Sequence, residues 1–201
     1  MLTGGRLNSE NHQKIKPLPF WSTLRADVSR FREEDPGIRS LVRGLLSQGF
    51  FAIMTYRMFR WFFERNIPTQ PIRFLVERIV EITTGISIPA QAQIGQGLRI
   101  HHFGGIFIHS EAVIGERCTL YHAVTLGDLG GWGGTPTVGN NVLIGAGAKL
   151  LGDITVGDHA RIGANAVVLQ SVPSGCLAVG VPAVVKDRSN GVSSSIPPGK
   201  L

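Results

Sequence analysis

His102 and His122 are the residues whose type and spacing best fit acid–base chemistry. Each follows an aliphatic residue by two positions, Ile100 in one case and Leu120 in the other, and the two histidines are 20 residues apart. If six residues build one short strand and three strands build one coil, that separation is one coil plus a slip of two residues. Both histidines are therefore expected in the same slot of adjacent coils, with their backbones about 5 Å apart.

Imidazoles placed in this way favour transfer of an acyl group to an alcohol. A hydroxyl is a weak nucleophile at neutral pH, and a neutral imidazole can take its proton while the oxygen attacks a carbonyl. General-base help of this kind raises a rate by about 10² to 10⁴, and N–H groups of a glycine-rich corner could stabilise the oxyanion. We assign His102 as the general base, whereas His122 would orient it, bind the acceptor or only pack.

Other reactive side chains offer alternatives that the pattern supports less well. His101 and His109 are close to His102 in sequence, but no carboxylate or cysteine joins the histidines at a metal-ligand spacing, so no metal is expected. Cys118 could carry an acyl group, yet its place within a repeat favours burial as a small apolar residue. Cys118 and Cys176 lack the spacing of a disulfide framework, and the N-terminal residues lack an apolar secretory segment, which predicts a cytoplasmic protein.

A period of six residues predicts the elements that position these side chains. The period shifts phase by two residues within IHHFGGIFIH and is interrupted by the glycine-rich GDLGGWGGTPT, from Gly127 to Thr137. It suits short strands joined by tight corners, with aliphatic side chains inside a prism and glycine, asparagine or aspartate at the corners. The recurring aliphatic residues are Ile88, Ile94, Ile100, Ile106, Ile108, Ile114, Leu120, Leu126, Val138, Ile144, Leu150, Val156, Ile162 and Val168.

The fold class is therefore expected to be mainly β, a parallel β-helix preceded by an α-helical segment. We expect disorder over residues 1–18, helices over 19–86, the β-helix over 87–185 and a flexible tail over 186–201. The formal charge of +6 is expected to reflect a solvated basic surface. Nucleic acid is not expected as a partner, because no basic run is interleaved with aromatic residues.

Three helices are predicted in the N-terminal segment. The first is capped by Ser22 and ends before Pro36, the second runs from Ile38 to Asn66, and the third ends at Gly85. The second helix contains the most hydrophobic run of the chain, LLSQGFFAIMTYRMFRWFF. Because arginines inside that run make a bilayer position costly, we expect a packed amphipathic helix, with peripheral contact to an anionic membrane as an additional possibility.

Several motifs together resemble the serine acetyltransferase branch of the hexapeptide acyltransferases. They are FREEDPGIRS, IGQGLRIHHFGG, VTLGD, VLIGAGAKLLGDITVGDHARIGANAVVLQSVP and AVGVPA, and the resemblance covers Thr23 to Val185. It implies a left-handed β-helix, acetyl-CoA as co-substrate, His102 as the catalytic histidine, and a homotrimer or a dimer of trimers. It also implies a donor channel lined by Gly127, Ala146, Arg161 and Ala164.

Departures from this branch concern the acceptor. The aspartate that supports the catalytic histidine corresponds to Ser87, the Asp-His pair is replaced by His101 and His102, and the loop lacks the Arg-His-Pro that grips the carboxylate of serine. Asp35 matches an aspartate that contacts the serine amine. IHH and YHAVT are instead similar to polysaccharide acetyltransferases of the colanic-acid type, and Trp132 in the loop could stack on a sugar.

The sequence therefore predicts an O-acetyltransferase that modifies a sugar hydroxyl in the synthesis of a surface polysaccharide. Asp35, His101 and Trp132 are the predicted acceptor-binding residues, and the acceptor is expected to be a saccharide or another small molecule. The alternative is an L-serine O-acetyltransferase of cysteine synthesis. A third hypothesis, outside enzymology, is a β-helix that serves only as an assembly scaffold.

Overall fold

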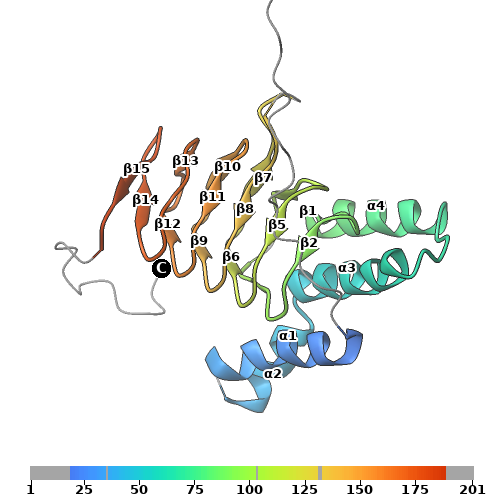
Figure 1. The fold of residues 1–201 in the computed structure, drawn as a ribbon. Coiled ribbons are helices and arrows are strands. Elements are labelled where there is room, and N and C mark those ends of the chain that lie inside the picture. Colours follow the sequence, from blue (N-terminus) through green and yellow to red (C-terminus); the bar gives the residue numbers. More distant parts are fainter. Residues whose placement is uncertain (1–18, 35, 103, 131–132, 189–201) are drawn as a thin grey trace, which may run out of the picture.

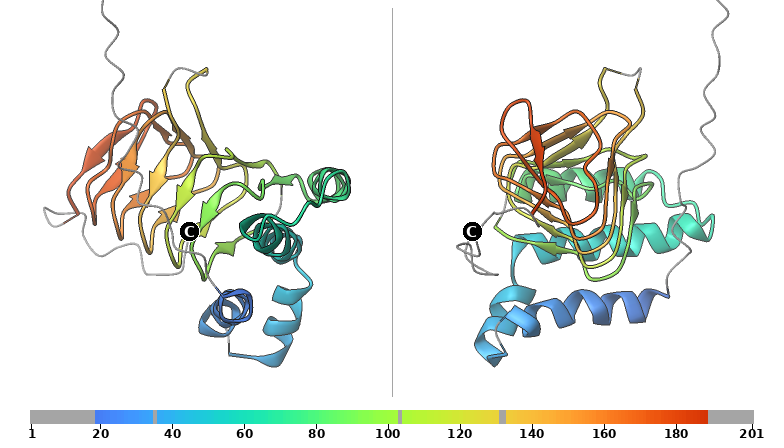
Figure 2. Two further views of the ribbon diagram at one scale, coloured as in Figure 1. Left: turned by 45° about the vertical axis from the view of Figure 1, so that its right-hand side comes forward. Right: turned by 60° about the vertical axis from the view of Figure 1, so that its left-hand side comes forward.

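The structure is a computed structural model that describes residues 19–34, 36–102, 104–130 and 133–188. Four helices come first in this described part, and fifteen short strands follow and wind into a prism (Figure 1). Figure 2 shows the coils stacked on one another, with the helices gathered at the end where the prism begins. The helices α3 and α4 contact the first strands directly, and α1 and α2 pack onto α3.

The helices begin and end where local backbone chemistry requires it. Their bounds are α1 (Phe20–Glu34), α2 (Ile38–Leu45), α3 (Gln48–Glu64) and α4 (Ile72–Thr84). The predicted end of the third helix is confirmed, because Gly85 adopts the left-handed conformation at φ 67° and its N–H donates to the carbonyl of Glu81.

Two predictions about the helices are wrong. The predicted helix from Ile38 to Asn66 is divided into α2 and α3, because Ser47 is extended and its hydroxyl accepts a hydrogen bond from the N–H of Phe50. That N-cap starts a new helix in a new direction. Ser22 does not cap α1, which already begins at Phe20.

Fifteen strands form three sheets, one for each face of the prism. Their orders are β1-β4-β7-β10-β13, β2-β5-β8-β11 and β3-β6-β9-β12-β14-β15. Neighbours pair in parallel, except that β15 pairs antiparallel with β14. The bounds are β1 (Ile86–Ser87), β2 (Gln93–Ile94), β3 (Arg99–Ile100), β4 (Ile106–Ile108), β5 (Val113–Ile114), β6 (Thr119–Leu120), β7 (Thr125–Gly127), β8 (Thr137–Val138), β9 (Leu143–Ile144), β10 (Lys149–Leu151), β11 (Thr155–Val156), β12 (Arg161–Ile162), β13 (Val167–Val168), β14 (Leu177–Val179) and β15 (Val184–Lys186).

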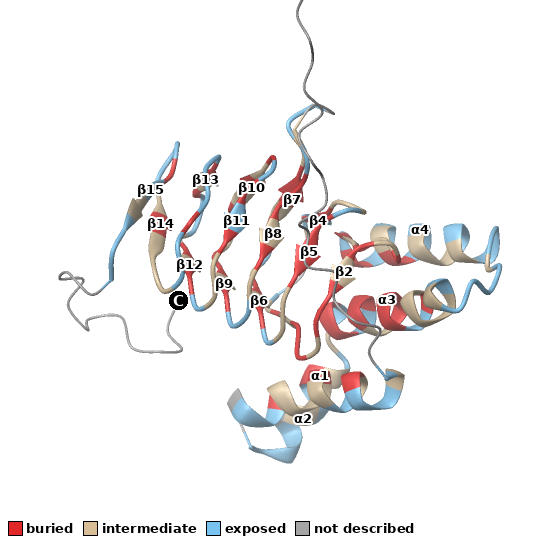
Figure 3. Cartoon of the chain, viewed as in Figure 1, coloured by how far each residue is buried: buried red, intermediate tan, exposed pale blue. Residues whose placement is uncertain are grey.

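Aliphatic side chains of the predicted period fill the prism. Each of them is at most 9% exposed, and most are fully buried. Figure 3 shows this as a line of buried positions that recurs along successive strands. Burial of this continuous apolar column is the main favourable contribution to the free energy of folding. The six-residue period therefore predicted the core correctly.

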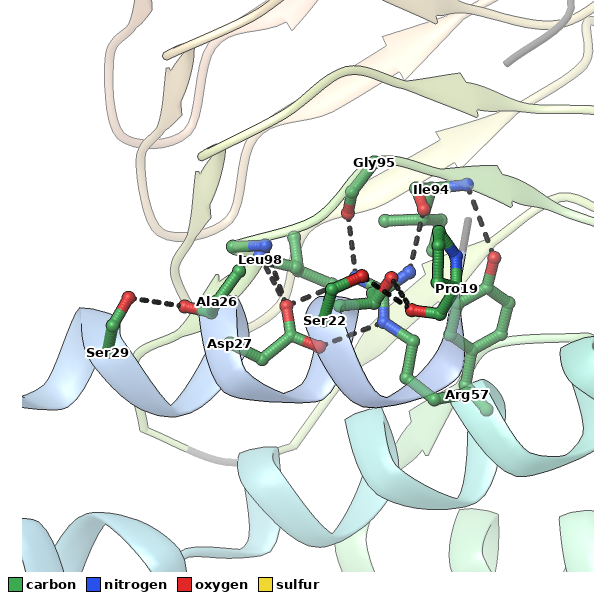
Figure 4. A network of polar contacts seen from close by, with 12 residues as sticks. Pro19, Ser22, Ala26, Asp27, Ser29, Arg57, Ile94, Gly95 and Leu98 are labelled. Carbon is green, nitrogen blue, oxygen red and sulfur yellow. Dashed lines mark hydrogen bonds and ion pairs between the residues drawn. The ribbon is translucent and has the colours of Figure 1, made fainter. Parts of the chain in front are cut away.

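A buried carboxylate, that of Asp27 in α1, ties the helices to the first coil. Asp27 is fully buried and lies between α3 and the corner that follows β2. Its Oδ1 accepts hydrogen bonds from the N–H groups of Gly97 (2.7 Å) and Leu98 (3.1 Å), and its Oδ2 accepts one from Nε of Arg57 (2.9 Å) (Figure 4). The charge is thus compensated by one guanidinium and two backbone donors.

Arg57 completes this anchor from α3. Its Nη1 donates to the carbonyl of Ile94 and its Nη2 to that of Gly95, both at 2.7 Å. The adjacent Tyr56 adds a further link, because its hydroxyl donates to the carbonyl of Ala92 and accepts from the N–H of Ile94. One turn of α3 therefore satisfies backbone groups at the open end of the prism that no earlier coil could pair.

No helix among the described residues is long and apolar enough to cross a bilayer. The hydrophobic run in α3 packs on the prism, and Arg60 in that run donates to the carbonyl of Gln91 at 3.0 Å. Apolar side chains do remain exposed on α4, among them Ile72, Phe74 and Ile82. Peripheral membrane contact stays a prediction.

Asp27→Ala is expected to lower the free energy of unfolding by about 3–5 kcal/mol, because it leaves the Arg57 guanidinium buried without its partner. Glu33→Ala is the matched control, since Glu33 pairs with Arg117 at 2.8 Å but both side chains are more than 40% exposed. That surface pair should contribute about 1 kcal/mol or less. Urea unfolding followed by circular dichroism measures both, and equal losses would contradict the anchoring role of Asp27.

Candidate active site

One corner of the prism brings together the two histidines and two of the predicted donor residues. It follows the strands β3, β6, β9 and β12, whose residues Ile100, Leu120, Ile144 and Ile162 are aligned in register. Two positions after these come His102, His122, Ala146 and Ala164 in turn. The ring centroids of His102 and His122 are 5.7 Å apart in an edge-to-face arrangement. The predicted proximity of the histidines is confirmed.

The structure corrects the prediction that both histidines occupy the same slot. In the later coils the N–H of Gly147 donates to the carbonyl of His122, but in the first coil the N–H of Ala123 donates to Gly104. Gly104 therefore fills the ladder position that corresponds to His122. The chain between His101 and Gly104 is two residues longer than in the next coil, so His102 lies in a bulge on the corner.

A left-handed backbone conformation sets the direction of His102. Its φ is 64°, and this left-handed residue is additional to the regular one, because Gly105 (φ 68°) occupies the position that Ala123 (φ 59°) and Gly147 (φ 74°) hold in the next coils. This region is sparsely populated by residues other than glycine and is found at functional sites more often than elsewhere. The imidazole of His102 is exposed, as is that of His122.

Tyr121 is a site residue that the sequence did not single out. Its ring stacks on His101 with centroids 4.9 Å apart and planes at 15°, and it lies 6.3 Å from the ring of His102. The rings of His101 and His102 are 6.4 Å apart, so His101 also lies close to the corner. The sequence did contain a signal for Tyr121: like His101, it comes one residue after the aliphatic residue of its repeat, so the two side chains are expected side by side.

Helix α2 forms the wall of an open hollow in front of His102. The hollow has a volume of about 620 Å³ and is lined by Arg39, Val42, Arg43, Leu46, Ser47, Gln48 and His102. The sequence did not indicate this wall, because the residues were assigned to one long helix. The break at Ser47 is what turns α2 so that it can face the corner.

Of the remaining predicted site residues, one lies near the corner and another does not. Arg161 is half-buried at the start of β12, three residues before Ala164, and so lies near the corner. Gly127 ends β7 on another face and is buried, and its carbonyl accepts a hydrogen bond from Gly152. The structure therefore does not bring Gly127 to the histidines within one chain. Asp35 and Trp132 lie outside the described residues.

Cys118 is held as a thiol inside the prism. It is fully buried, and its Sγ lies 3.1 Å from the carbonyl oxygen of Gly139. Burial raises the pKa of the Cys118 thiol to about 11. A thiol that stays protonated at neutral pH is a poor nucleophile, so direct transfer suits this corner better than a covalent enzyme intermediate. Among the described residues, no group of three or more potential ligands could hold a metal ion.

The chain is similar to known proteins in both sequence and fold. Residues 135–170 match the family "Bacterial transferase hexapeptide (six repeats)". A serine acetyltransferase of Synechococcus elongatus is 41% identical over 173 residues, which are 85% of this chain and 70% of that protein. A solved serine acetyltransferase in complex with CoA has a TM-score of 0.74 and 34% identity, over 83% of this chain and 69% of that one. A soybean serine acetyltransferase complexed with serine has a TM-score of 0.76 and 35% identity, over 83% and 69%.

Fold and corner define an acyltransferase of the hexapeptide-repeat class that uses acetyl-CoA, and the predicted left-handed parallel β-helix is confirmed by the match in fold. The hypothesis of a scaffold without activity is thereby set aside. The chain belongs to the serine acetyltransferase family.

The predicted sugar acceptor, and with it polysaccharide synthesis, is wrong. Relatives that are 37–43% identical over at least 81% of the chain are named serine acetyltransferase. The prediction depended on Ser87, which replaces the supporting aspartate, and on the loop at 127–137, which lacks Arg-His-Pro. Neither departure excludes an amino acid, because another element can supply polar groups for the acceptor.

Cys118 is expected to resist alkylation by iodoacetamide at neutral pH in the folded protein, because its thiol is protonated and buried. Cys176 is only partly buried and should react. Mass spectrometry should find one modified cysteine in the native protein and two in guanidinium chloride, and Cys176→Ser should abolish the native label. Native labelling of Cys118 would show that the interior opens readily.

Proposed function

We propose that this chain is an L-serine O-acetyltransferase that transfers the acetyl group of acetyl-CoA to the serine hydroxyl. The observation that carries the proposal is the family membership together with an exposed histidine corner that faces an open hollow. The hollow gives an amino acid access to His102 from the side of α2. Only a small acceptor needs to enter, because the donor can approach along the corner.

His102 is the general base in this proposal. Its imidazole takes the proton of the serine hydroxyl as the oxygen attacks the thioester carbonyl, and the resulting tetrahedral oxyanion collapses with loss of the CoA thiolate. The imidazolium then returns the proton to that thiolate. His122, with its ring edge-to-face at 5.7 Å, orients His102 or contacts the acceptor.

The row of small residues below the histidines suits the donor. Ala146 is half-buried and Ala164 is exposed, and both continue the corner that carries His102 and His122. Side chains of this size leave a shallow track along the prism for an extended thioester arm. We expect Arg161, near the end of this track, to contact an anionic part of the donor. Gly127 could contribute to the channel only from a neighbouring chain.

His102→Asn is expected to lower kcat for serine-dependent release of CoA by about 10² to 10⁴, the usual contribution of a general base. Asparagine tolerates the left-handed backbone of this position, so the fold should be kept. The matched control is His109→Asn, because His109 is half-buried and its Nδ1 accepts from the N–H of Glu111 away from the corner. Thiol release is measured with L-serine and with monosaccharides as acceptors.

Two outcomes would contradict the proposal. Activity of His102→Asn equal to that of the control would remove His102 from catalysis. Release of CoA that depends on a sugar and not on L-serine would reverse the assignment of the acceptor. Circular dichroism of both variants separates a loss of chemistry from a loss of fold.

We also propose a homotrimer in which the histidine corner lies between neighbouring prisms. The corner is exposed in the single chain, and a neighbouring prism would shield it from water and could supply Gly127. Light scattering after size exclusion should give three times the chain mass of 21.7 kDa, or six times for a dimer of trimers. A monomer with full activity would contradict a shared site. The predicted cytoplasmic location stays a prediction.

A further inference from the structure

We propose that Arg39 and Arg43 of α2 bind the carboxylate of the acceptor and thereby select an amino acid. This inference rests on the proposed function. It assigns the recognition of the carboxylate to a helix that precedes the β-helix. Both residues are thus specificity-determining, while His102 performs the chemistry.

Position is the first support. Arg39 and Arg43 are four residues apart, so they lie on one face of α2, and both line the hollow that His102 also lines. In L-serine the carboxylate is attached to the carbon next to the one that bears the hydroxyl. A serine whose hydroxyl reaches His102 therefore has its carboxylate within a few ångströms of His102, a distance that the hollow lined by Arg39 and Arg43 can accommodate.

Unbalanced charge is the second support. Six other arginines, Arg30, Arg57, Arg60, Arg73, Arg78 and Arg117, form ion pairs with carboxylates of the chain. The exposed Arg25 and Arg32 of α1 form none with described residues but lie away from His102. Arg39 and Arg43 form neither an ion pair nor a hydrogen bond with any described residue, and both are exposed. Two guanidinium groups on one helical face repel each other unless an anion lies between them. A carboxylate fits this position because guanidinium donors can bind it bidentately.

The wall is also held firmly enough to position a ligand. Gly44 packs against the ring of Phe31 in α1, where a Cβ atom would overlap that ring. Phe31 in turn contacts Phe50 of α3 edge-to-face, with centroids 5.4 Å apart. The backbone of α2 is therefore fixed between α1 and α3, and only the long arginine side chains need to be ordered by the ligand.

The phosphates of CoA are the other anions that this enzyme meets. They lie at the far end of the pantetheine arm from the thioester, whereas the hollow contains His102 itself. An acceptor carboxylate is thus the better match for Arg39 and Arg43. The two cases differ in which Michaelis constant responds to the loss of the arginines.

The test compares the unmodified protein with the double variant Arg39→Met/Arg43→Met, using L-serine and L-serinamide as acceptors. Serinamide keeps the hydroxyl and the amine but replaces the carboxylate by a neutral amide. The variant should lower kcat/KM for L-serine by about 10- to 100-fold, chiefly through KM, because charge-assisted hydrogen bonds are lost. Its kcat/KM for serinamide and its KM for acetyl-CoA should stay within about threefold of the original values, since neither depends on the carboxylate contact.

Matched controls separate recognition from charge and from folding. Arg25→Met/Arg32→Met removes two exposed arginines from α1 and should leave all constants unchanged. Arg39→Lys/Arg43→Lys keeps the charge without the planar fork and should recover part of kcat/KM for L-serine.

Three results would overturn the inference. Equal losses with L-serine and serinamide would make the arginines structural, and unchanged kcat/KM for L-serine would exclude them from the site. A rise in KM for acetyl-CoA alone would assign them to the phosphates of the donor. A wild-type protein without turnover of L-serine would instead overturn the proposed function itself, and this inference with it.

Discussion

The carboxylate of Asp27 is the constraint on which the arrangement of the molecule depends. It is fully buried, so it must be compensated, and its partners are Arg57 in α3 and two backbone N–H groups at a corner of the first coil. Breaking one contact leaves a buried charge, which makes the junction intolerant of partial change. Together with the hydrogen bonds of Tyr56 and Arg60 to the first coil, the carboxylate fixes three elements in one relative orientation.

The position of α2, which lines the hollow next to His102, depends on that orientation. With α1 and α3 fixed, α2 is held between them and faces the corner of the prism. The corner supplies the histidines and a row of small residues, and the helix supplies a basic wall. The site is therefore assembled from two structural units, and neither of them contains all of its groups. This also explains why the bulge at His102 matters, since it places the imidazole outside the regular ladder, toward the wall.

Acceptor specificity illustrates how an argument from absent residues can fail. Ser87 and the loop at 127–137 lack groups expected for an amino acid, and the sequence was therefore interpreted in favour of a sugar. The relatives contradict that interpretation. The physical reason is that a carboxylate can be bound by any guanidinium that reaches it, and Arg39 and Arg43 line the same hollow as His102. A positive charge for the carboxylate can therefore come from a helix outside the loop, and the sequence of the loop does not reveal it.

The sequence by itself determined the prism, its aliphatic core and the proximity of His102 to His122. A six-residue period is a local property, and every inward position repeats it, so no long-range information was needed. The tertiary structure alone decided the break of the predicted helix at Ser47, the place of His102 in a bulge and the approach of α2 to the corner. These features depend on contacts between residues far apart in the chain, such as Asp27 with Leu98, whose partners no periodicity specifies.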